Sequence, residues 1–244
     1  MRAADEELMD DRKFFDRLRE VGRERYHDRH PFHVRMNAGE LSQGEIRSWV
    51  ANRFEYQRII PRKDAAILAN CPIREVRMAW ARRIADHDGD GTPGRIGGIE
   101  AWLKLAEATG LGRDEVLDGR YVVPGVKFAS GAYLEFARTR PWPIAVASSL
   151  TELFAPDLMG ERIAAFRQYY AWVPAWGLEY FEGRPPLARR DAGEALELTL
   201  AYCDTPAMRR QAVEALAFKC DVLWAMLDAT AAAPAIEAIS GGPA

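Results

Sequence analysis

The sequence predicts a single all-α domain, folded as a bundle of about eight to ten helices. Apolar residues recur three and four positions apart along most of the chain, which is the spacing of one helix face. Strand signals are almost absent, because the one β-branched cluster, at 121–126, is short and contains Pro-Gly. The links are short and evenly spread. We therefore expect one domain over 1–244, with an ordered core at about 12–230 and a frayed tail at 231–244.

The first three helices are predicted from apolar stripes and from end signals. A first helix ends near Val21 and carries the stripe Leu8, Phe15 and Leu18. Ser42 followed by Glu45 has the spacing of a capping box, which predicts the start of a second helix that Pro61 interrupts. A third helix is predicted from about residue 75 to residue 87.

The later helices are predicted from the same periodicity. The last one begins at the start signal Thr205-Pro206 and runs to about Thr230. The glycine-rich segment 88–94 has no strand before it and no Gly-Lys-Ser/Thr after it, so it is interpreted as a loop rather than a phosphate-binding site. The remaining helices are expected near 97–110, 125–139, 143–154, 157–169, 174–182 and 187–203.

Composition and charge exclude several classes of function. The 33 Lys and Arg residues against 36 Asp and Glu residues give a net charge of −3, so binding of nucleic acid through overall charge is not expected. The 3 cysteines are odd in number and lack CxxC spacing, which disfavours a disulfide framework or a zinc site. No stretch reaches the ~18–20 apolar residues of a membrane span, and the N-terminus has no signal-peptide pattern. We expect a soluble cytoplasmic protein.

Charged side chains lie on three helix faces that should be buried. An uncompensated buried charge costs several kcal/mol, so each of these cations needs a partner. Two interpretations stay open: each pairs with an internal carboxylate such as Glu152 or Asp191, or together they form a pocket for a small polyanion. The three faces are Trp49, Arg53, Tyr56, Gln57 and Ile60; Val76, Trp80, Arg83 and His87; and Leu216, Lys219, Leu223 and Leu227.

The histidines suggest acid–base chemistry rather than a metal site. His27, His30 and His33 are clustered, but Pro31 breaks the helix between them, and the second half of the chain has no Glu-x-x-His pattern of di-iron bundles. We therefore expect no metal. His27 and His87 are candidates for proton transfer near neutral pH, with a structural role as the alternative for each.

Seven ordered blocks closely resemble the pyrroloquinoline-quinone synthase family, and the resemblance extends over about residues 12–230. The blocks are YHDRHPFH (26–33), WVANRF (49–54), PRKDAAILANCP (61–72), DHDG (86–89), GGIEAWL (97–103), SSLTELFAP (148–156) and FKCDVLW (218–224). The resemblance implies a helical fold like that of haem oxygenase, without haem, and a homodimer.

The resemblance also implies an activity. Such an enzyme closes the second nitrogen ring of a bicyclic precursor with three carboxylates and removes eight electrons. It uses O2 as co-substrate, releases H2O2 and needs no metal or organic cofactor. This is the last step of pyrroloquinoline quinone synthesis. The only implied partner is the small-molecule substrate, with no nucleic acid and no membrane.

Carried over by position, the resemblance implies a set of site residues. Of these, His87, His27, Tyr180, Arg184 and Lys219 are predicted to take part in catalysis, with His87 as the base. The cations that would hold carboxylates and quinone oxygens are Arg53, Lys63, Arg83, Arg162, Arg184 and Lys219. The residues that would line the ring are Tyr26, His27, Tyr56, Gln57, Tyr133 and Tyr180, with Glu152 as an internal polar partner.

Two departures from the family pattern motivate the alternatives. Met159 stands where family members carry histidine, and Glu55 stands where they carry tyrosine. One alternative is therefore a degenerate paralogue that binds the quinone or its precursor without full turnover. A thiaminase-II-like hydrolase would need a nucleophilic cysteine, which the apolar neighbours of Cys203 and Cys220 do not favour. A metal-dependent helical oxidase is opposed by the missing histidines.

Overall fold

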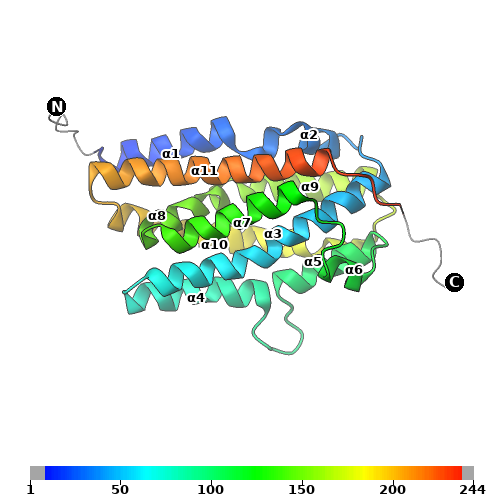
Figure 1. Ribbon diagram of the computed structural model, residues 1–244, viewed down its shortest axis with the longest axis horizontal. Helices are drawn as coiled ribbons and strands as arrows, with labels where there is room; N and C mark the ends of the chain where they lie inside the picture. The colour runs from blue at the N-terminus through cyan, green and yellow to red at the C-terminus, as the bar shows by residue number, and fades with distance from the viewer. Residues whose placement is uncertain (1–8, 238–244) are drawn as a thin grey trace.

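The computed structural model describes residues 9–237 as one elongated bundle in which the long helices run side by side (Figure 1). This confirms the predicted all-α class, and the described residues contain no strand. The α-helices are α1 (Asp11–Arg25), α2 (Pro31–Asn37), α3 (Gln43–Asn70), α4 (Arg74–Asp88), α5 (Gly98–Ala108), α6 (Arg113–Leu117), α7 (Pro124–Thr139), α8 (Trp142–Ala147), α9 (Ala155–Tyr169), α10 (Glu179–Tyr202) and α11 (Pro206–Ala231). Short 3-10 turns are η1 (His27–Arg29), η2 (Ser148–Leu153) and η3 (Ala175–Leu178).

The two start signals found in the sequence are both present. The Ser42 hydroxyl accepts a hydrogen bond from the Glu45 amide at 3.2 Å, and the Glu45 carboxylate accepts one from the Ser42 amide at 2.8 Å, which completes the capping box of α3. At the other end of the chain the Thr205 hydroxyl accepts from the Met208 amide at 3.2 Å and caps α11.

The sequence predicted that internal prolines would end helices, and this prediction was wrong. Pro61 lies inside α3, which continues to Asn70, and Pro185 and Pro186 lie inside α10. The predicted helices at 174–182 and 187–203 are therefore largely one helix, preceded by η3. A proline costs a helix one hydrogen bond and some distortion, but α3 and α10 are packed on several sides, and the burial of their side chains offsets that loss.

Other differences concern the buried face of the first helix and the shortest elements. The buried face of α1 holds Phe14 and Leu18, whereas Phe15 is half-buried; Leu8 lies outside the described residues. The helix expected at 143–154 is α8 followed by η2, and α2 and α6 were not predicted. A pattern of seven residues or fewer covers at most two turns, too few to show a helical period.

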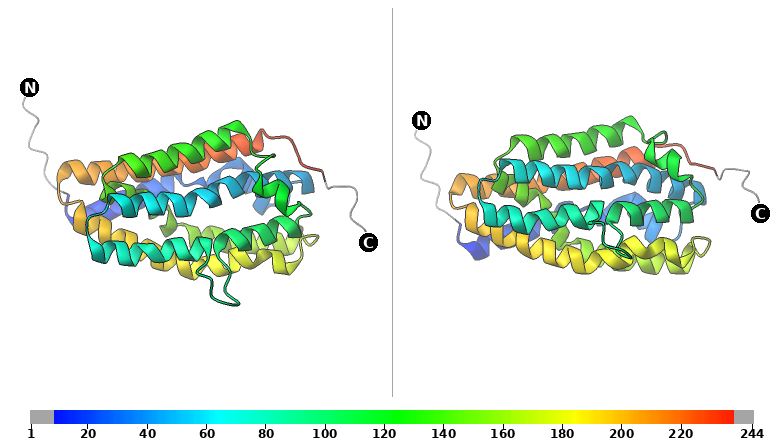
Figure 2. Two further views of the ribbon diagram at one scale, coloured as in Figure 1. Left: turned by 60° about the horizontal axis from the view of Figure 1, so that its bottom comes forward. Right: turned by 90° about the horizontal axis from the view of Figure 1, so that it is seen from below.

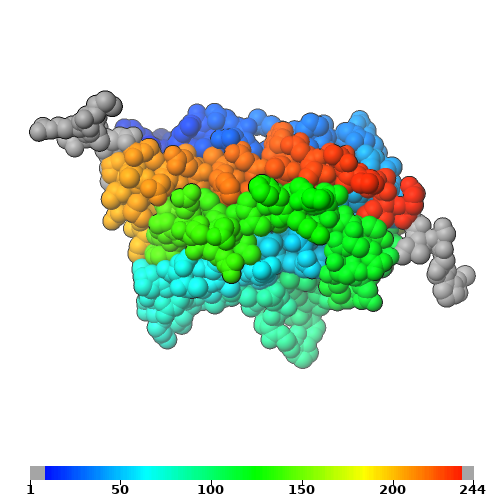
Figure 3. All heavy atoms as spheres, viewed as in Figure 1, coloured from blue at the N-terminus to red at the C-terminus, as the bar shows by residue number. Residues whose placement is uncertain are grey.

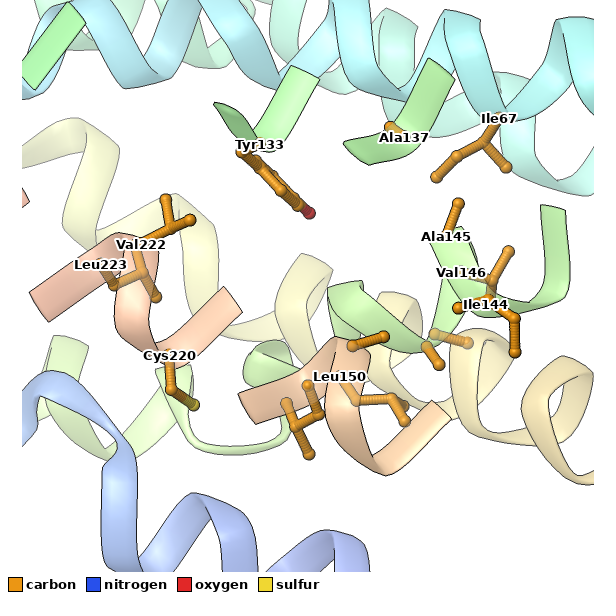
Figure 4. Close-up of a cluster of buried hydrophobic side chains, with 14 of the residues drawn as sticks. Ile67, Tyr133, Ala137, Ile144, Ala145, Val146, Leu150, Cys220, Val222 and Leu223 are labelled. Carbon is orange, nitrogen blue, oxygen red and sulfur yellow. The ribbon is translucent and has the colours of Figure 1, made fainter. Parts of the chain in front are cut away.

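The core consists of two apolar clusters, and α3 contributes to both. Figure 2 shows α3 running lengthwise between α7 on one side and α4 and α5 on the other. One cluster lies between α1, the second half of α3, α4, α7, α8, α10 and α11, and Figure 4 shows part of it, with Tyr133 projecting inward from α7. The other lies between α2, the first half of α3, α5, α9 and α10. The junction of the two clusters is where polar side chains enter the interior.

Two segments outside the helices differ in how they are held. The predicted glycine-rich loop joins α4 to α5 and projects from the edge of the molecule (Figure 3). A Cβ on Gly97 would lie 2.5 Å from the carbonyl oxygen of His87, so the base of this loop closes only with glycine. Of the tail expected to be frayed, residues 232–237 are described, and the Ile236 amide donates to the Gly44 carbonyl at 3.1 Å. Residues 238–244 lie outside the described residues.

None of the described helices is long and apolar enough to cross a membrane.

Candidate functional site

A cavity of about 60 Å³ lies at the junction of the two apolar clusters, and α3, η2, α9, α10 and α11 surround it. We call it the central pocket. Many of the predicted site residues line it, which sequence separation alone would not suggest. Its lining is Tyr26, His27, Arg53, Tyr56, Ile60, Thr151, Glu152, Ala155, Met159, Arg162, Tyr180, Arg184 and Leu223.

Three cations in and behind this pocket have no carboxylate within ion-pair distance among residues 9–237. They come from three helices: Arg53 from α3, Arg162 from α9 and Lys219 from α11. We call them the unpaired cations. Arg162 and Lys219 are almost completely buried. Buried positive charge without a negative partner is unstable by itself, so this arrangement favours an anionic ligand.

Lys219 is held by aromatic rings instead of a carboxylate. Its ammonium donates a hydrogen bond to the Tyr56 hydroxyl and lies 3.5 Å from the centre of the Tyr133 ring. The rings of Tyr56 and Tyr133 are stacked with centroids 6.2 Å apart. Burial, followed by the positive charges of Arg53 and Lys63, holds the pKa of Lys219 well below its usual value.

Arg162 is held by histidines and aromatic rings. Its guanidinium donates to the His33 Nε2 atom at 3.0 Å, and the His33 Nδ1–H group donates to the His27 carbonyl at 3.0 Å. The Nε–H group of Arg162 is buried and has no hydrogen-bond partner. Burial, together with the charge of Arg53, lowers the pKa of Arg162 to about 10. An incoming carboxylate would satisfy the orphaned donor and relieve this repulsion.

His27 has a similarly unsatisfied environment. Its Nδ1 atom is buried without a partner, and its ring lies 4.9 Å from the His33 ring. Burial first, and then the charges of His33 and Arg53, keep the pKa of His27 well below its usual value. The neighbouring phenol of Tyr26 is also affected, because burial raises the pKa of Tyr26. Both groups are neutral near pH 7.

A second group of charges, which begins in the pocket lining and extends behind it, forms ion pairs within the protein. The carboxylate of Glu152 accepts hydrogen bonds from Arg83 and, at 3.0 Å, from Arg184. Arg184 also lies 3.2 Å from Asp191, and Arg83 lies 3.8 Å from both Asp191 and Asp64. For Arg83 the structure therefore shows the first of the two open interpretations, pairing with Glu152 and Asp191.

Lys63 belongs to the same paired group. Its ammonium lies 2.6 Å from the Asp64 carboxylate and donates to the Ser149 hydroxyl at 2.8 Å. Asp64 also accepts from the Trp80 indole at 2.8 Å. Burial lowers the pKa of Lys63, and the adjacent Asp64 opposes that shift. We call this group the ion-pair cluster; it consists of Lys63, Asp64, Arg83, Glu152, Arg184 and Asp191.

Gln57 positions a ring of the pocket from behind. The Tyr180 hydroxyl donates to the Gln57 Oε1 atom at 3.1 Å, and the Tyr180 ring also contacts the Trp102 ring, with centroids 4.9 Å apart. The Gln57 Nε2 group is completely buried and has no partner. The amide nitrogen carries two N–H donors and neither is used, so it can donate to an incoming acceptor.

His87 lies outside the central pocket, on the far side of Tyr180 and Arg184. Its Nδ1–H group donates to the Arg83 carbonyl at 3.1 Å, which leaves Nε2 as a buried acceptor without a partner. Burial, and next the charge of Arg184, lower the pKa of His87 to about 3. The imidazole is therefore neutral at pH 7, with a free lone pair on Nε2.

The two departures from the family pattern have different places in the structure. The Glu55 carboxylate pairs with Arg58 on the next turn of α3 and does not line the pocket, so its negative charge is directed away from the unpaired cations. Met159 lines the pocket beside Arg162. Its thioether is a weak hydrogen-bond acceptor and no donor.

Neither cysteine chemistry nor a metal site is built into this region. Burial raises the pKa of Cys203 to about 11 and that of Cys220 to about 12, which makes both thiols poor nucleophiles. No cysteine lines the pocket. Among the described residues, no three His, Cys, Asp or Glu side chains gather in a way that could hold a metal ion.

The predicted residues thus fall into three places. Sequence reasoning missed Thr151 and Ala155 in the lining, and Asp64 and His33 behind it; Asp64 directly follows Lys63 in a buried helix, which is the one signal that could have found it. In the lining are Tyr26, His27, Arg53, Tyr56, Glu152, Arg162, Tyr180 and Arg184. Behind it are Gln57, Lys63, Arg83, Tyr133 and Lys219, and His87 lies across Tyr180 and Arg184.

Comparison with known proteins identifies the family. The model of the TENA/THI-4/PQQC family matches residues 15–229, which is nearly all of the described chain. The chain belongs to the TENA/THI-4/PQQC family. Within this family it is 53% identical over 228 residues to the pyrroloquinoline-quinone synthase of Pseudomonas aeruginosa, covering 93% of this chain and 90% of that protein. It is 50% identical over 212 residues to the enzyme of the same name from Klebsiella pneumoniae, covering 87% and 84%.

Solved structures support the same fold for this TENA/THI-4/PQQC member. A domain with a haem oxygenase-like fold from Shewanella denitrificans superposes with a TM-score of 0.74 over 92% of this chain and 93% of that one, at 12% identity. A TenA homologue from Pseudomonas syringae superposes with a TM-score of 0.71 over 90% and 91%, at 11% identity. At these identities the likeness establishes the haem oxygenase-like fold, which the resemblance implied.

Proposed function

We propose that this protein is a pyrroloquinoline-quinone synthase. It closes the second nitrogen ring of a bicyclic tricarboxylate precursor and completes its eight-electron oxidation with O2, with release of H2O2. The observation that carries the proposal is the set of unpaired cations: Arg53 and Arg162 line one pocket of phenol and imidazole rings, and Lys219 lies directly behind its Tyr56 wall. The identity of about 50% to two enzymes of that name, over most of the chain, gives the proposal its substrate.

The charges of the pocket match the ligand. A tricarboxylate supplies the negative partners that the three unpaired cations lack, and each charge-assisted hydrogen bond contributes about 1.5–3 kcal/mol. The orphaned donors of Arg162 and Gln57 add two specific contacts for carboxylate or quinone oxygens. The aromatic rings of Tyr26, Tyr56 and Tyr180 supply flat apolar surfaces for the bicyclic ring.

The size of the pocket requires movement on binding. Sites for drug-sized ligands span about 300–1,000 Å³, whereas this cavity measures about 60 Å³. The bicyclic precursor therefore enlarges the pocket, and Tyr180 and Arg184 are the side chains that separate it from the space next to His87. When they move apart, the His87 Nε2 atom faces the ligand.

His87 is proposed as the base that removes protons from ring carbon. Its Nε2 lone pair is free, and Arg83 fixes the tautomer through its carbonyl. A pKa of about 3 is too low for efficient proton removal at pH 7, so the negative charge of the bound substrate must raise it. The unpaired cations stabilise the charge that grows on the quinone oxygens as each proton leaves. The quinone itself carries the redox chemistry.

We further propose that turnover needs no metal or organic cofactor, and that the protein is a cytoplasmic homodimer. The support for all three is the family resemblance. Sedimentation analysis of the purified protein at several concentrations tests the dimer; a monomer at every concentration contradicts it.

A second candidate is a paralogue that binds the quinone or its precursor without full turnover. Met159 in the pocket lining is the observation in its favour, because a thioether cannot donate a hydrogen bond to O2 or peroxide. The high identity to the named synthases over most of the chain does not favour it.

One experiment distinguishes the two candidates. Metal-stripped protein is mixed with the bicyclic precursor in air, and the absorption spectrum, O2 uptake and H2O2 release are followed together. Conversion to pyrroloquinoline quinone with O2 uptake supports the synthase and its independence of metal. A shifted, stable spectrum without O2 uptake supports the binding paralogue. An unchanged spectrum contradicts both.

A further inference from the structure

His33 lies outside the lining of the central pocket, yet it bonds to two residues of that lining. It comes from α2 and is almost completely buried. Its Nδ1–H group donates to the His27 carbonyl at 3.0 Å, and its Nε2 atom accepts from the Arg162 guanidinium at 3.0 Å. Because a carbonyl only accepts and a guanidinium only donates, these two bonds fix the tautomer of the imidazole. One side chain therefore joins a pocket residue of η1 to a pocket residue of α9.

The bond to His33 is the one hydrogen bond that Arg162 makes among residues 9–237. The guanidinium carbon also lies 4.9 Å from the centre of the Trp49 ring and 5.6 Å from that of the Phe181 ring. These rings hold the plane of the guanidinium, and the directional bond to His33 holds its orientation within that plane. The Nε–H group of Arg162 is left buried and unpaired.

His33 holds its guanidinium without supplying a negative charge. In the ion-pair cluster, by contrast, Arg184 lies 3.0 Å from the Glu152 carboxylate and 3.2 Å from that of Asp191, so its charge is already balanced. Burial first, and then the charge of Arg162, hold the pKa of His33 well below its usual value, so the imidazole is neutral near pH 7. A neutral acceptor satisfies one donor of Arg162 and leaves its positive charge uncompensated.

We propose that His33 is a positioning residue for ligand recognition: as a neutral acceptor it orients Arg162 in the pocket and leaves the charge of that side chain available to a carboxylate of the ligand. The orphaned Nε–H group of Arg162 is a donor for such a carboxylate. The same imidazole holds the backbone of His27, so it supports two sides of the lining at once. The inference rests on the proposed function, from which the tricarboxylate ligand comes.

Three substitutions separate the acceptor from its charge. His33→Gln keeps a neutral acceptor near the Nε2 position, His33→Leu removes the acceptor, and His33→Glu supplies a charged acceptor that pairs with Arg162. His30→Asn is the matched control. His30 is equally buried and lies in the same segment, but it bonds to Asp228 at 3.0 Å instead of a pocket residue, and asparagine retains its cap on the Phe32 amide.

The first measurement is the affinity for pyrroloquinoline quinone, the product of the proposed reaction, by calorimetric titration. We expect His33→Gln and His30→Asn to bind it as the wild type does, and His33→Leu to bind it more weakly. His33→Glu should lose most, about 10–100-fold, because the charge of Arg162 is then balanced within the protein. Wild-type affinity in His33→Glu overturns the proposal. A loss in His33→Gln or His30→Asn as large as that in His33→Glu also overturns it, because a neutral acceptor would then not be the cause.

A double-mutant cycle tests whether His33 acts through Arg162, and it does not depend on how well His33→Glu folds. In the Arg162→Met background, His33→Leu should cause no further loss of affinity. Additive losses overturn the proposal. Circular dichroism of each variant checks that folded protein is titrated. A wild type that binds no pyrroloquinoline quinone overturns the proposed function and this role with it, whereas wild-type binding with unaffected His33 variants overturns this role alone.

Discussion

Two regions of the buried interior carry similar numbers of cations but differ in how those cations are satisfied. In the ion-pair cluster, Arg83 and Arg184 share the carboxylates of Glu152 and Asp191. At the other side of the pocket, Lys219 has only a phenol and two aromatic rings. The first region is complete without a ligand, and the second is not. We therefore expect buried charge to serve structure in one place and ligand recognition in the other.

The difference has an energetic consequence. Removing one member of a complete buried ion pair leaves its partner uncompensated, whereas removing an unpaired buried cation relieves a desolvation cost. The same substitution should therefore have opposite effects on the free energy of unfolding in the two regions. Ligand binding should respond in the opposite way, because replacing an unpaired cation should weaken binding more than replacing a member of the ion-pair cluster.

The largest expected effect is on stability. Arg83→Met should lower the free energy of unfolding by about 3–5 kcal/mol, because Glu152, Asp64 and Asp191 lose a shared partner. Lys219→Met, of similar volume and equally buried, should leave it within about 1 kcal/mol of wild type or raise it. Urea denaturation followed by circular dichroism measures both. Equal losses in the two variants would mean that the two regions hold their cations in the same way.

The next effect concerns binding. Lys219→Met should weaken binding of the precursor by about 10–100-fold, since one charge-assisted contact of about 1.5–3 kcal/mol is lost. Calorimetric titration without O2 measures it. Arg25→Gln is the control on α1, because Arg25 is exposed and pairs only with Asp221 at the surface. Unchanged affinity in Lys219→Met would remove the case for an anion pocket at this position.

A smaller effect concerns pH and tests His87, whose ring is hydrogen-bonded to the backbone carbonyl of Arg83 in the ion-pair cluster. Its pKa is about 3 in the folded protein and about 6.5 when unfolded, so between these values the unfolded chain binds more protons. The free energy of unfolding should therefore fall as the pH drops through this window. In His87→Gln the slope should be reduced by up to about 1.4 kcal/mol per pH unit. Parallel slopes for variant and wild type would contradict a neutral buried imidazole.

The smallest effect concerns Met159. Met159→His places a hydrogen-bond donor next to Arg162 in the pocket lining and should speed the O2-dependent phase of the reaction a few-fold. Stopped-flow absorbance at several O2 concentrations measures it. Glu55→Gln serves as the control departure from the family pattern, because its carboxylate pairs with Arg58 outside the pocket. Identical oxidation kinetics in Met159→His would show that position 159 does not handle oxygen.

Much of the fold could be predicted from the sequence, because long amphipathic helices carry a clear period and Ser42 and Thr205 mark helix starts. Pro61, Pro185 and Pro186 were misleading, since a proline's local cost is visible in the sequence but the packing that offsets it is not. The presence of buried cations could be predicted as well.

The partners of the buried cations could not be assigned from the spacing of residues in the sequence. Arg83 and Lys219 occupy equivalent positions on apolar stripes, yet Arg83 meets carboxylates from α3, η2 and α10 while Lys219 meets only rings. Glu152 and Asp191 were named as candidate partners, but only the three-dimensional arrangement decides which cation they reach. The location of His87 beyond Tyr180 and Arg184 depends on the same arrangement.

The adjacent prolines of α10 also affect which part of the bundle opens most readily. Neither Pro185 nor Pro186 has an amide hydrogen, so the carbonyls of residues 181 and 182 have no helical donor four positions later. The turn that carries Tyr180 and Arg184 is therefore attached to the rest of its helix by fewer backbone hydrogen bonds than the turns after it. Its amides should exchange with deuterated solvent through local opening, at a lower free energy than global unfolding, while the core of α3 stays protected.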